Sequence, residues 1–127
     1  MINNDRKKQL NSFENGIGYK FNNILLLATA LTHSSYVNES KNNLSSNERL
    51  EFLGDSVLGL VISHFLYTNF PDDPEGNLTK LRAGVVSEAS LSKVSKSLRV
   101  GEYILLGKGE ERTGGRKRES ILADALE

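Results

Sequence analysis

The chain has 127 residues, enough for one domain with a hydrophobic core of its own. Its 16 basic and 16 acidic residues give a net charge of zero, which excludes a strongly basic protein and confines any nucleic-acid contact to a local patch. The absence of cysteine excludes disulfides and thiolate metal sites, and it is compatible with a reducing compartment.

The N-terminal third predicts short helices and no targeting segment. Residues 1–13 lack the apolar core of a signal peptide, and the apolar runs of the chain are too short and interrupted to span a membrane. We therefore expect a soluble cytoplasmic protein. A polar helix is predicted over Asp5–Phe13. A second helix is predicted from Ile24 to about Leu31, with Asn22 or Asn23 as its cap.

Residues 31–36 read LTHSSY and lead into a polar loop. His33 is predicted to form hydrogen bonds that order a helix end, in preference to a catalytic role. Residues 38–46 are rich in Asn and Ser and have no periodicity, which predicts a mobile loop.

Residues 47–56, NERLEFLGDS, carry three carboxylates at helical spacing. At about 100° per residue, Glu48, Glu51 and Asp55 fall within a stripe roughly 60° wide on one helix face. The helix is predicted to end near Asn69, because Pro71 disfavours helical geometry at the residue before it.

The residues after this acidic stripe predict a buried helix. Residues 57–66, VLGLVISHFL, are apolar on nearly every side, and such a helix normally lies in a core. Burying carboxylates beside it costs several kcal/mol per group unless they are neutralised. The stripe is therefore a solvated face, a set of partners for Arg or Lys, or a site for Mg²⁺, Mn²⁺ or Ca²⁺, which prefer oxygen ligands.

Two other residues of the same stretch have local roles. Asn47 can cap the central helix with its side chain. Phe52 lies about 40° from Glu48 around the helix, beside the acidic stripe. On spacing alone, Phe52 predicts an ordinary core side chain.

The segment from residue 70 to residue 101 predicts a turn and two helices. FPDDPEGN is the turn, and the first helix starts at Asn77. Ser87 can cap the second helix and Gly101 can close it. The apolar positions predicted to face inward are Leu78, Leu81, Val85 and Val86 on the first helix and Leu91, Val94 and Leu98 on the second.

A glycine-rich loop and a basic cluster follow. GKGEERTGG lacks the GK[ST] of a phosphate-binding P-loop, so its spacing predicts a flexible connection. Arg116, Lys117 and Arg118 either form a solvated charge run or hold a phosphodiester backbone without reading sequence. On the final helix, ESILADALE, Asp124 and Glu127 lie three residues apart on one face. Helical patterns dominate throughout, which predicts the all-α class.

Five segments together resemble the ribonuclease III family, the endonucleases that cut double-stranded RNA. NERLEFLGDS resembles the defining motif of the family, and the other segments are LTHSSY, PEGNLTKLRA, LLGKGEERTGGR and SILADALE. They occur in the family's order and cover the chain from about Ile17 to its last residue. The resemblance implies that residues 1–127 are a helical ribonuclease III endonuclease domain.

The resemblance also implies roles for particular residues. It makes Glu51, Asp55, Asp124 and Glu127 the acidic active-site cluster, with Glu51, Asp124 and Glu127 as direct metal ligands and Asp55 as a supporting carboxylate. It places Glu48 and Glu75 at the RNA-processing surface. It offers a second interpretation of Phe52, as an anchor that inserts into a partner subunit, and that interpretation stands beside the core one.

The implied reaction is hydrolysis of double-stranded RNA with Mg²⁺, or Mn²⁺ as a substitute, to give 5′-phosphate and 3′-hydroxyl ends. Four carboxylates can hold a cation that activates water and neutralises charge on the phosphate. A homodimer would carry two sites, one for each strand, and would recognise A-form shape. Roles in ribosomal and messenger RNA processing, in the cytoplasm and without a membrane partner, follow from the same resemblance.

The sequence departs from the family at its end. Family members continue with the apolar remainder of this helix, and usually with a double-stranded-RNA-binding domain, and neither is present after Glu127. The alternative function is a non-catalytic RNA-binding or ribosome-associated module on the same fold. Such a module would be expected to lose some of the carboxylates, whereas this chain keeps all of them.

Overall fold

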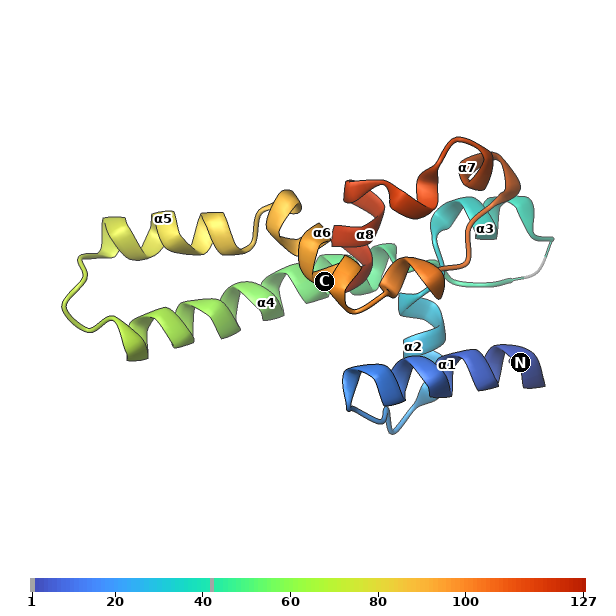
Figure 1. Ribbon diagram of the computed structural model, residues 1–127, viewed down its shortest axis with the longest axis horizontal. Helices are drawn as coiled ribbons and strands as arrows, with labels where there is room; N and C mark the ends of the chain where they lie inside the picture. Colours follow the sequence, from blue (N-terminus) through green and yellow to red (C-terminus); the bar gives the residue numbers. More distant parts are fainter. Residues whose placement is uncertain (1, 42) are drawn as a thin grey trace.

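A computed structural model describes residues 2–41 and 43–127, and the described chain is helical throughout (Figure 1). Its elements are α1 (Asn4–Ile17), α2 (Ile24–Ala30), α3 (Ser34–Glu39), α4 (Glu48–Asn69), α5 (Glu75–Val85), α6 (Glu88–Ser97), η1 (Val100–Glu102), α7 (Lys108–Arg112), η2 (Gly115–Lys117) and α8 (Glu119–Leu126). Among the described residues, strand-like pairing is limited to one isolated parallel bridge between Thr32 and Leu105. The predicted all-α class is confirmed.

The first two helices form where the sequence predicts them, although α1 is longer than expected. Its cap is Asn3, whose side chain accepts a hydrogen bond from the Arg6 backbone N–H at 2.8 Å. It ends at Gly18, which has a φ of 71°. Asn23 caps α2 by accepting from the Leu25 N–H at 3.1 Å.

One hydrophobic core joins the N-terminal helices to the C-terminal quarter of the chain. Leu10 of α1 and Ile104, between η1 and α7, are almost completely buried at its centre. The other buried members are Phe13, Leu27, Leu31, Val100, Leu106, Ile121 and Leu122. Because Ile121 and Leu122 lie on α8, the core fixes that helix and therefore the position of its carboxylates.

His33 orders the start of α3, as predicted. Its Nδ1 accepts a hydrogen bond from the Ser35 backbone N–H at 3.1 Å. The Ser35 hydroxyl in turn accepts from the Gly107 N–H at 2.9 Å, which links α3 to the segment before α7. The polar stretch after α3 has no regular structure where it is described, and Asn42 of the predicted loop lies outside the described residues.

The predicted length of α4 is confirmed, but its predicted burial is wrong. Leu66 is its one buried residue, whereas Phe52 is 79% exposed and Leu60 72% exposed. The reason is that α5 lies along its C-terminal half and the end of α8 contacts its N-terminal part, while little else of the described chain covers it (Figure 1). An apolar helix predicts a covered face, but it does not say that the cover comes from the same chain.

The expectation that no apolar segment is long enough to span a membrane is also too strict. By length and composition alone, α4 could cross one. The same helix carries Glu48 and Glu51 in its first turn and packs against α5, so exposed apolar surface on α4 also fits contact with another protein surface.

Asn47 sits at the start of α4 without capping it through its side chain. Its side-chain amide instead donates to the Ala30 carbonyl at 3.1 Å, and its backbone N–H donates to the Thr32 carbonyl at 2.9 Å. The side chain is buried, and these two bonds tie the first turn of α4 to the end of α2. The tertiary contact has taken the hydrogen-bonding capacity that a cap would use.

The segment after α4 departs from prediction in two ways. Helix α5 begins at Glu75, two residues before the predicted Asn77, with Pro74 at the cap position. Its predicted inward positions are not buried, because α5 packs mainly on α4. Ser87 caps α6 as predicted, by accepting from the Ser90 N–H at 3.2 Å.

The buried face of α6 is made of serines as well as leucine. Leu91 is buried as predicted, but Val94 and Leu98 are exposed, and Ser92 and Ser95 are completely buried. Small side chains let α6 and α8 approach closely, and this is the most extensive helix contact in the described chain. Hydrophobicity alone predicted the wrong buried face of α6, because close packing against α8 requires side chains of small volume.

Ser95→Ala is expected to leave the free energy of unfolding unchanged or raise it by about 1 kcal/mol, because the buried Ser95 hydroxyl has no hydrogen-bond partner among the described residues. Ser95→Leu should lower it by roughly 1–3 kcal/mol by forcing α6 away from α8. Urea unfolding monitored by circular dichroism measures both. If Ser95→Ala lowers the free energy of unfolding as much as Ser95→Leu does, the Ser95 hydroxyl contributes to stability and the small volume of the side chain is not the reason for serine here.

Gly101 does not close α6. The helix is followed by Arg99 in the left-handed conformation, with a φ of 59°, a position where glycine is usual. Gly101 lies inside η1, and it is needed there because a Cβ would lie 2.9 Å from the Arg116 carbonyl oxygen. Gly101 is therefore needed because two backbone segments pack closely there, and not because a helix ends there.

Candidate metal centre

Helices α4 and α8 meet at Gly54. A Cβ at this position would overlap the backbone carbonyl of Glu127, the residue that follows α8. A helix interior normally disfavours glycine by roughly 0.5–1 kcal/mol, so its presence here has a packing reason. The absence of a side chain brings the end of α8 against the same turn of α4 that carries Glu51 and Asp55.

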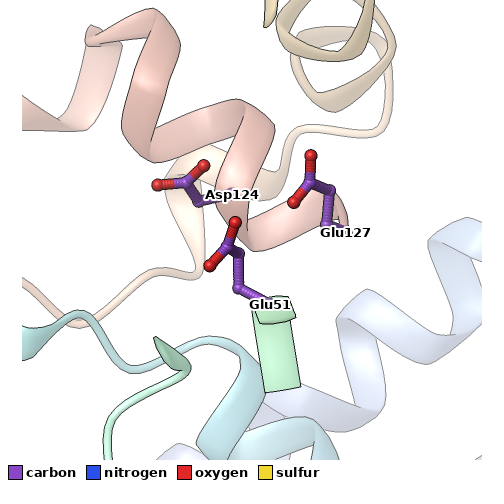
Figure 2. A group of neighbouring side chains, drawn as sticks. All are labelled: Glu51, Asp124 and Glu127. Atoms are coloured by element: carbon purple, nitrogen blue, oxygen red, sulfur yellow. The ribbon is translucent and has the colours of Figure 1, made fainter. Parts of the chain in front are cut away.

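The crossing gathers three carboxylates from two helices. Glu51 comes from α4, and Asp124 and Glu127 come from the end of α8 (Figure 2). Each residue offers one carboxylate oxygen, and these oxygens lie within 4.8 Å of one another. Asp124 is exposed, whereas Glu51 and Glu127 are half-buried, so the group opens to the surface on one side.

The carboxylates resist carrying full negative charge together. Burial, a hydrogen bond with Glu51 and the neighbouring charge of Asp55 raise the pKa of Glu127 to about 7. Burial and then the charge of Glu51 raise the pKa of Asp124 above its ordinary value. Neighbouring acids of like charge hold protons at a pH where a lone carboxyl would be ionised.

The donor set fits a divalent cation. The Glu127 Oε2 atom is buried and has no hydrogen-bond partner within the described part of the chain. The ion pairs found there do not involve the three carboxylates, so pairing with Arg or Lys does not neutralise them. Three carboxylates that point together are the oxygen ligands that Mg²⁺ and Mn²⁺ accept.

The other predicted acidic residues lie at different distances from this group. Asp55 is exposed and lies outside the set of three, although its charge acts on Glu127. Glu48 is exposed in the first turn of α4. Glu75 begins α5 at the outer end of the α4–α5 hairpin, so this chain does not bring it to the carboxylates (Figure 1).

His33 lies close enough to the carboxylates for their charges to act on its pKa. Burial lowers its pKa, while the charges of Asp124 and Glu48 act in the opposite direction. Its Nδ1 is engaged with Ser35, at 2.7 Å from the hydroxyl. The predicted structural role of His33 is therefore confirmed.

The glycine-rich segment is ordered, which corrects the prediction of a flexible connection. Residues Lys108–Arg112 form α7, and the Glu39 carboxylate accepts hydrogen bonds from the Lys108 N–H at 2.6 Å and the Gly109 N–H at 3.1 Å. These backbone bonds lower the pKa of Glu39. Because a Cβ at Gly107 would collide with the Ser35 carbonyl, the glycine is required for close packing against α3.

Arg116 of the basic cluster is committed to contacts inside the chain. It forms an ion pair with Glu111 and donates from Nη1 to the Gly101 carbonyl at 2.7 Å and the Ile104 carbonyl at 2.8 Å. The bond with Glu111 raises the pKa of Arg116. Its role in the described structure is to hold two backbone segments together.

Arg118 is also paired inside the chain, whereas Lys117 is exposed. Arg118 forms an ion pair with Glu110 and donates to the Thr113 carbonyl at 3.1 Å. No ion pair of Lys117 is found within residues 2–41 and 43–127. The cluster is therefore not a uniform solvated run, and Lys117 is the member most available to an external anion.

Phe52 and an apolar groove lie on the part of α4 beside the carboxylates. Phe52 is exposed, so the interpretation of it as a core residue is wrong for the described chain. On another side of α4, a cavity of about 470 Å³ is lined by apolar residues of α1, α2 and α4, among them Phe13, Leu53 and Val57. Glu51, Asp124 and Glu127 form its polar end.

Gly54 is the functional residue that reasoning from the sequence missed. The signal was present, since a glycine in the middle of a long helical pattern costs stability and suggests a close approach. What the pattern could not supply was the identity of the approaching segment, which is distant in sequence.

This chain is similar to known proteins over most of its length. The model of the family described as Ribonuclease-III-like matches residues 23–127. The protein named Ribonuclease 3 of Clostridium tetani is 58% identical over 118 residues, which are 93% of this chain and 50% of that protein. That of Borreliella burgdorferi is 52% identical over 124 residues, 98% of this chain and 51% of the relative. The chain thus spans about half the length of these relatives.

Solved structures agree with this match. One structure of the nuclease domain of ribonuclease III from Campylobacter jejuni, described for flexibility in a region involved in dimer formation, has a TM-score of 0.82 at 46% identity and covers 90% of this chain and 76% of that one. A second, at 2.2 Å resolution, has a TM-score of 0.81 at 43% identity and covers 99% and 78%. The fold, the carboxylate group and these matches lead to one conclusion: the chain belongs to the ribonuclease III family.

Proposed function

We propose that this protein is an endonuclease that hydrolyses phosphodiester bonds of double-stranded RNA with a divalent metal ion. The observation that carries the proposal is the group of three carboxylates, each of which has one oxygen within 4.8 Å of the others. In the described part of the chain none of the three pairs with Arg or Lys, and the Glu127 Oε2 atom is buried without a hydrogen-bond partner. The family match supports RNA as the substrate.

In this proposal Glu51, Asp124 and Glu127 hold the cation, Mg²⁺ or Mn²⁺, and Asp55 supports Glu127 from the next turn of α4. A bound cation lowers the pKa of a water molecule and neutralises charge on the phosphate. The three carboxylates would fix the position of that cation, with Asp124 at the exposed side of the group. Hydrolysis then leaves a 5′-phosphate and a 3′-hydroxyl.

The proposed active form is a homodimer in which each subunit supplies one site and each site cuts one strand. Exposed apolar side chains on α4 support this assembly, with Phe52 the most exposed among them. The solved relative from Campylobacter jejuni is described as having a region involved in dimer formation. We propose that Phe52 inserts into the partner subunit.

Phe52→Ala is expected to weaken dimerisation by about 2 kcal/mol, because it truncates an aromatic anchor that the dimer would bury. Sedimentation velocity at several protein concentrations measures the dimer constant. Phe70→Ala is the matched control, since Phe70 is a second exposed phenylalanine and lies past the far end of α4. Equal dimer constants for Phe52→Ala and the wild type would remove Phe52 from the interface.

RNA contacts are also proposed for residues outside the carboxylate group. Glu48 and Glu75 would help set the position of cleavage, and the cluster Arg116, Lys117 and Arg118 would contact the RNA backbone. Because Arg116 and Arg118 are paired within the chain, direct contact falls mainly to Lys117. Backbone contacts of this kind bind all sequences alike and weaken with salt. Processing of ribosomal and messenger RNA in the cytoplasm is the proposed setting.

The test of this function is incubation of the protein with a labelled RNA duplex, with Mg²⁺ and with a chelator. Cleavage only with Mg²⁺, confined to RNA duplex and absent on single-stranded RNA and DNA duplex, is the expected result. The product ends should accept a ligase that needs a 5′-phosphate. Tight binding of the duplex without cleavage at any metal concentration would make the protein a non-catalytic RNA-binding module instead.

A further inference from the structure

The side of α8 that faces away from the carboxylates carries a second cavity. Leu122 and Asp124 are two residues apart, which places their side chains about 200° apart around the helix. Leu122 lines a cavity of about 480 Å³ together with Lys96, Arg99 and Lys117. The cavity is therefore separate from the candidate metal centre, and four of its seven lining residues are Lys or Arg.

Hydrogen bonds hold the floor of this basic groove together. Arg116 lines it and is held by bonds to the Gly101 carbonyl at 2.7 Å and the Ile104 carbonyl at 2.8 Å. A Cβ at Gly101 would lie 2.9 Å from the Arg116 carbonyl oxygen, so the two backbone segments of the floor are in direct contact. The groove is thus held by backbone contacts and is not made of surface side chains alone.

Arg99 is the unusual residue of the groove. Its φ of 59° is a left-handed conformation that favours glycine, so the arginine is kept at a strained position. Its ion-pair partner is Glu102, at 2.9 Å, but the two side chains are 72% and 55% exposed, and such pairs stabilise proteins little. The fold itself gains little from an arginine here, which points to a ligand outside the chain.

The charges define that ligand as a polyanion. Lys96, Arg99 and Lys117 line the groove beside one carboxylate, Glu102, and the charge of Arg116 is balanced by Glu111, although the whole chain has no net charge. Lysine and arginine side chains along a groove bind a phosphodiester backbone through charge and without reading bases. Phosphate groups spaced along a nucleic-acid strand match several cations in one groove.

We propose that this groove binds the phosphodiester backbone of a single-stranded RNA segment that flanks the duplex at the metal centre. The proposal rests on the proposed function, because it assumes a duplex over the carboxylates. A stiff duplex lying there cannot also turn around α8 to its other side, whereas a flexible single strand can. Lys117 then contacts the flanking strand and not the duplex.

The test compares a blunt RNA duplex with the same duplex carrying a single-stranded tail, by fluorescence anisotropy with Ca²⁺ in place of Mg²⁺ to slow cleavage. The wild type is expected to bind the tailed RNA several-fold more tightly. Lys96→Gln should remove most of that difference without changing the melting temperature. Lys80→Gln, on exposed α5, is the matched control with the same loss of charge.

Two further variants separate ligand binding from a structural role. Arg99→Gly relieves the left-handed strain, so it should raise the melting temperature while it lowers affinity for the tailed RNA. Glu102→Gln removes the carboxylate that competes for Arg99, and it should therefore increase the preference for the tail. If the Arg99–Glu102 pair is purely structural, Arg99→Gly should not raise the melting temperature while it lowers RNA affinity. Glu102→Gln should then also leave the preference for the tailed RNA unchanged.

Failure of this proposal is distinguishable from failure of the proposed function. If Lys96→Gln weakens binding of blunt and tailed RNA equally, or weakens neither, the groove does not bind the flanking strand. That result leaves the proposed cleavage of the duplex by the wild type untouched. If the wild type neither binds nor cuts a blunt duplex, the proposed function itself has failed, whatever the tail does.

Discussion

Glu127→Gln is expected to reduce cleavage of duplex RNA by about 100-fold or more, while affinity for the duplex changes by only a few-fold. Loss of a residue that merely supports a metal ligand commonly costs about 10–100-fold, so loss of a direct ligand should cost at least as much. The substitution keeps the size of the side chain and removes its charge. Single-turnover cleavage at limiting Mg²⁺, beside filter binding of the same duplex, measures the two effects.

The same variant should alter stability in the metal-free protein. The folded-state pKa of Glu127 is about 7, above its ordinary value of 4.5, so the folded state binds this proton more tightly than the unfolded state does. The resulting stabilisation is complete below the ordinary value and is lost as pH rises through about 7. The melting temperature measured in chelator should therefore fall between mildly acidic and mildly alkaline pH, and less steeply in Glu127→Gln.

Near-normal cleavage by Glu127→Gln at limiting Mg²⁺ would remove Glu127 from the proposed metal ligands. A parallel loss of cleavage and of RNA affinity would instead make the Glu127 side chain a binding or structural residue.

Gly54→Ala is expected to lower cleavage by about 100-fold without unfolding the domain. A methyl group there overlaps the Glu127 backbone, so the end of α8 must move away from α4. A shift of roughly 1 Å in reacting groups can reduce rates by about 100-fold. The core around Leu10 and Ile104 does not depend on this contact, so circular dichroism should still report a folded protein.

The matched control lies on the same helix. In the part of the chain that the structure describes, no atom lies within 4 Å of a Cβ built at Gly59, so Gly59→Ala should stabilise α4 by roughly 0.5–1 kcal/mol and leave cleavage unchanged. The Mn²⁺ affinity of both variants shows whether a loss of activity follows a loss of the metal site. Normal cleavage and normal Mn²⁺ affinity in Gly54→Ala would mean that the crossing tolerates the methyl group and does not position Glu127.

Much of the local structure follows from residue pattern. The spacing of Glu48, Glu51 and Asp55 predicted one helix face, and the position of Pro71 predicted the end of α4 at Asn69. The helix-ordering role of His33 followed from the same kind of reasoning. These predictions hold because they depend on interactions between residues close in sequence.

Predictions that depended on distant partners were less successful. Asn47, predicted as a cap, uses its side chain on the Ala30 carbonyl, and the buried face of α6 includes Ser92 and Ser95 because α8 packs closely there. Apolarity on nearly every side of α4 predicted burial, but it does not specify which surface supplies the cover. Packing between elements decides each of these cases.

The candidate site divides in the same way. Helical spacing alone placed Glu51 on one face and Asp124 with Glu127 on another, but it could not bring the two faces together. That convergence was expected from the resemblance to the family, and its physical cause is the glycine at the crossing of α4 and α8. The charges around Lys96 and Arg99 had no signal in the sequence, because the groove is formed by segments that only the fold brings together.

The most direct test of the metal centre is a titration with Mn²⁺ followed by electron paramagnetic resonance, in which protein-bound Mn²⁺ loses the six-line signal of the free ion. The protein should bind Mn²⁺ stoichiometrically at neutral pH, and Mg²⁺ should displace it. Simultaneous replacement of Glu51, Asp124 and Glu127 by Gln, Asn and Gln should abolish that binding while the domain remains folded. Unchanged Mn²⁺ binding in the folded triple variant would contradict the assignment of these three carboxylates as the metal site.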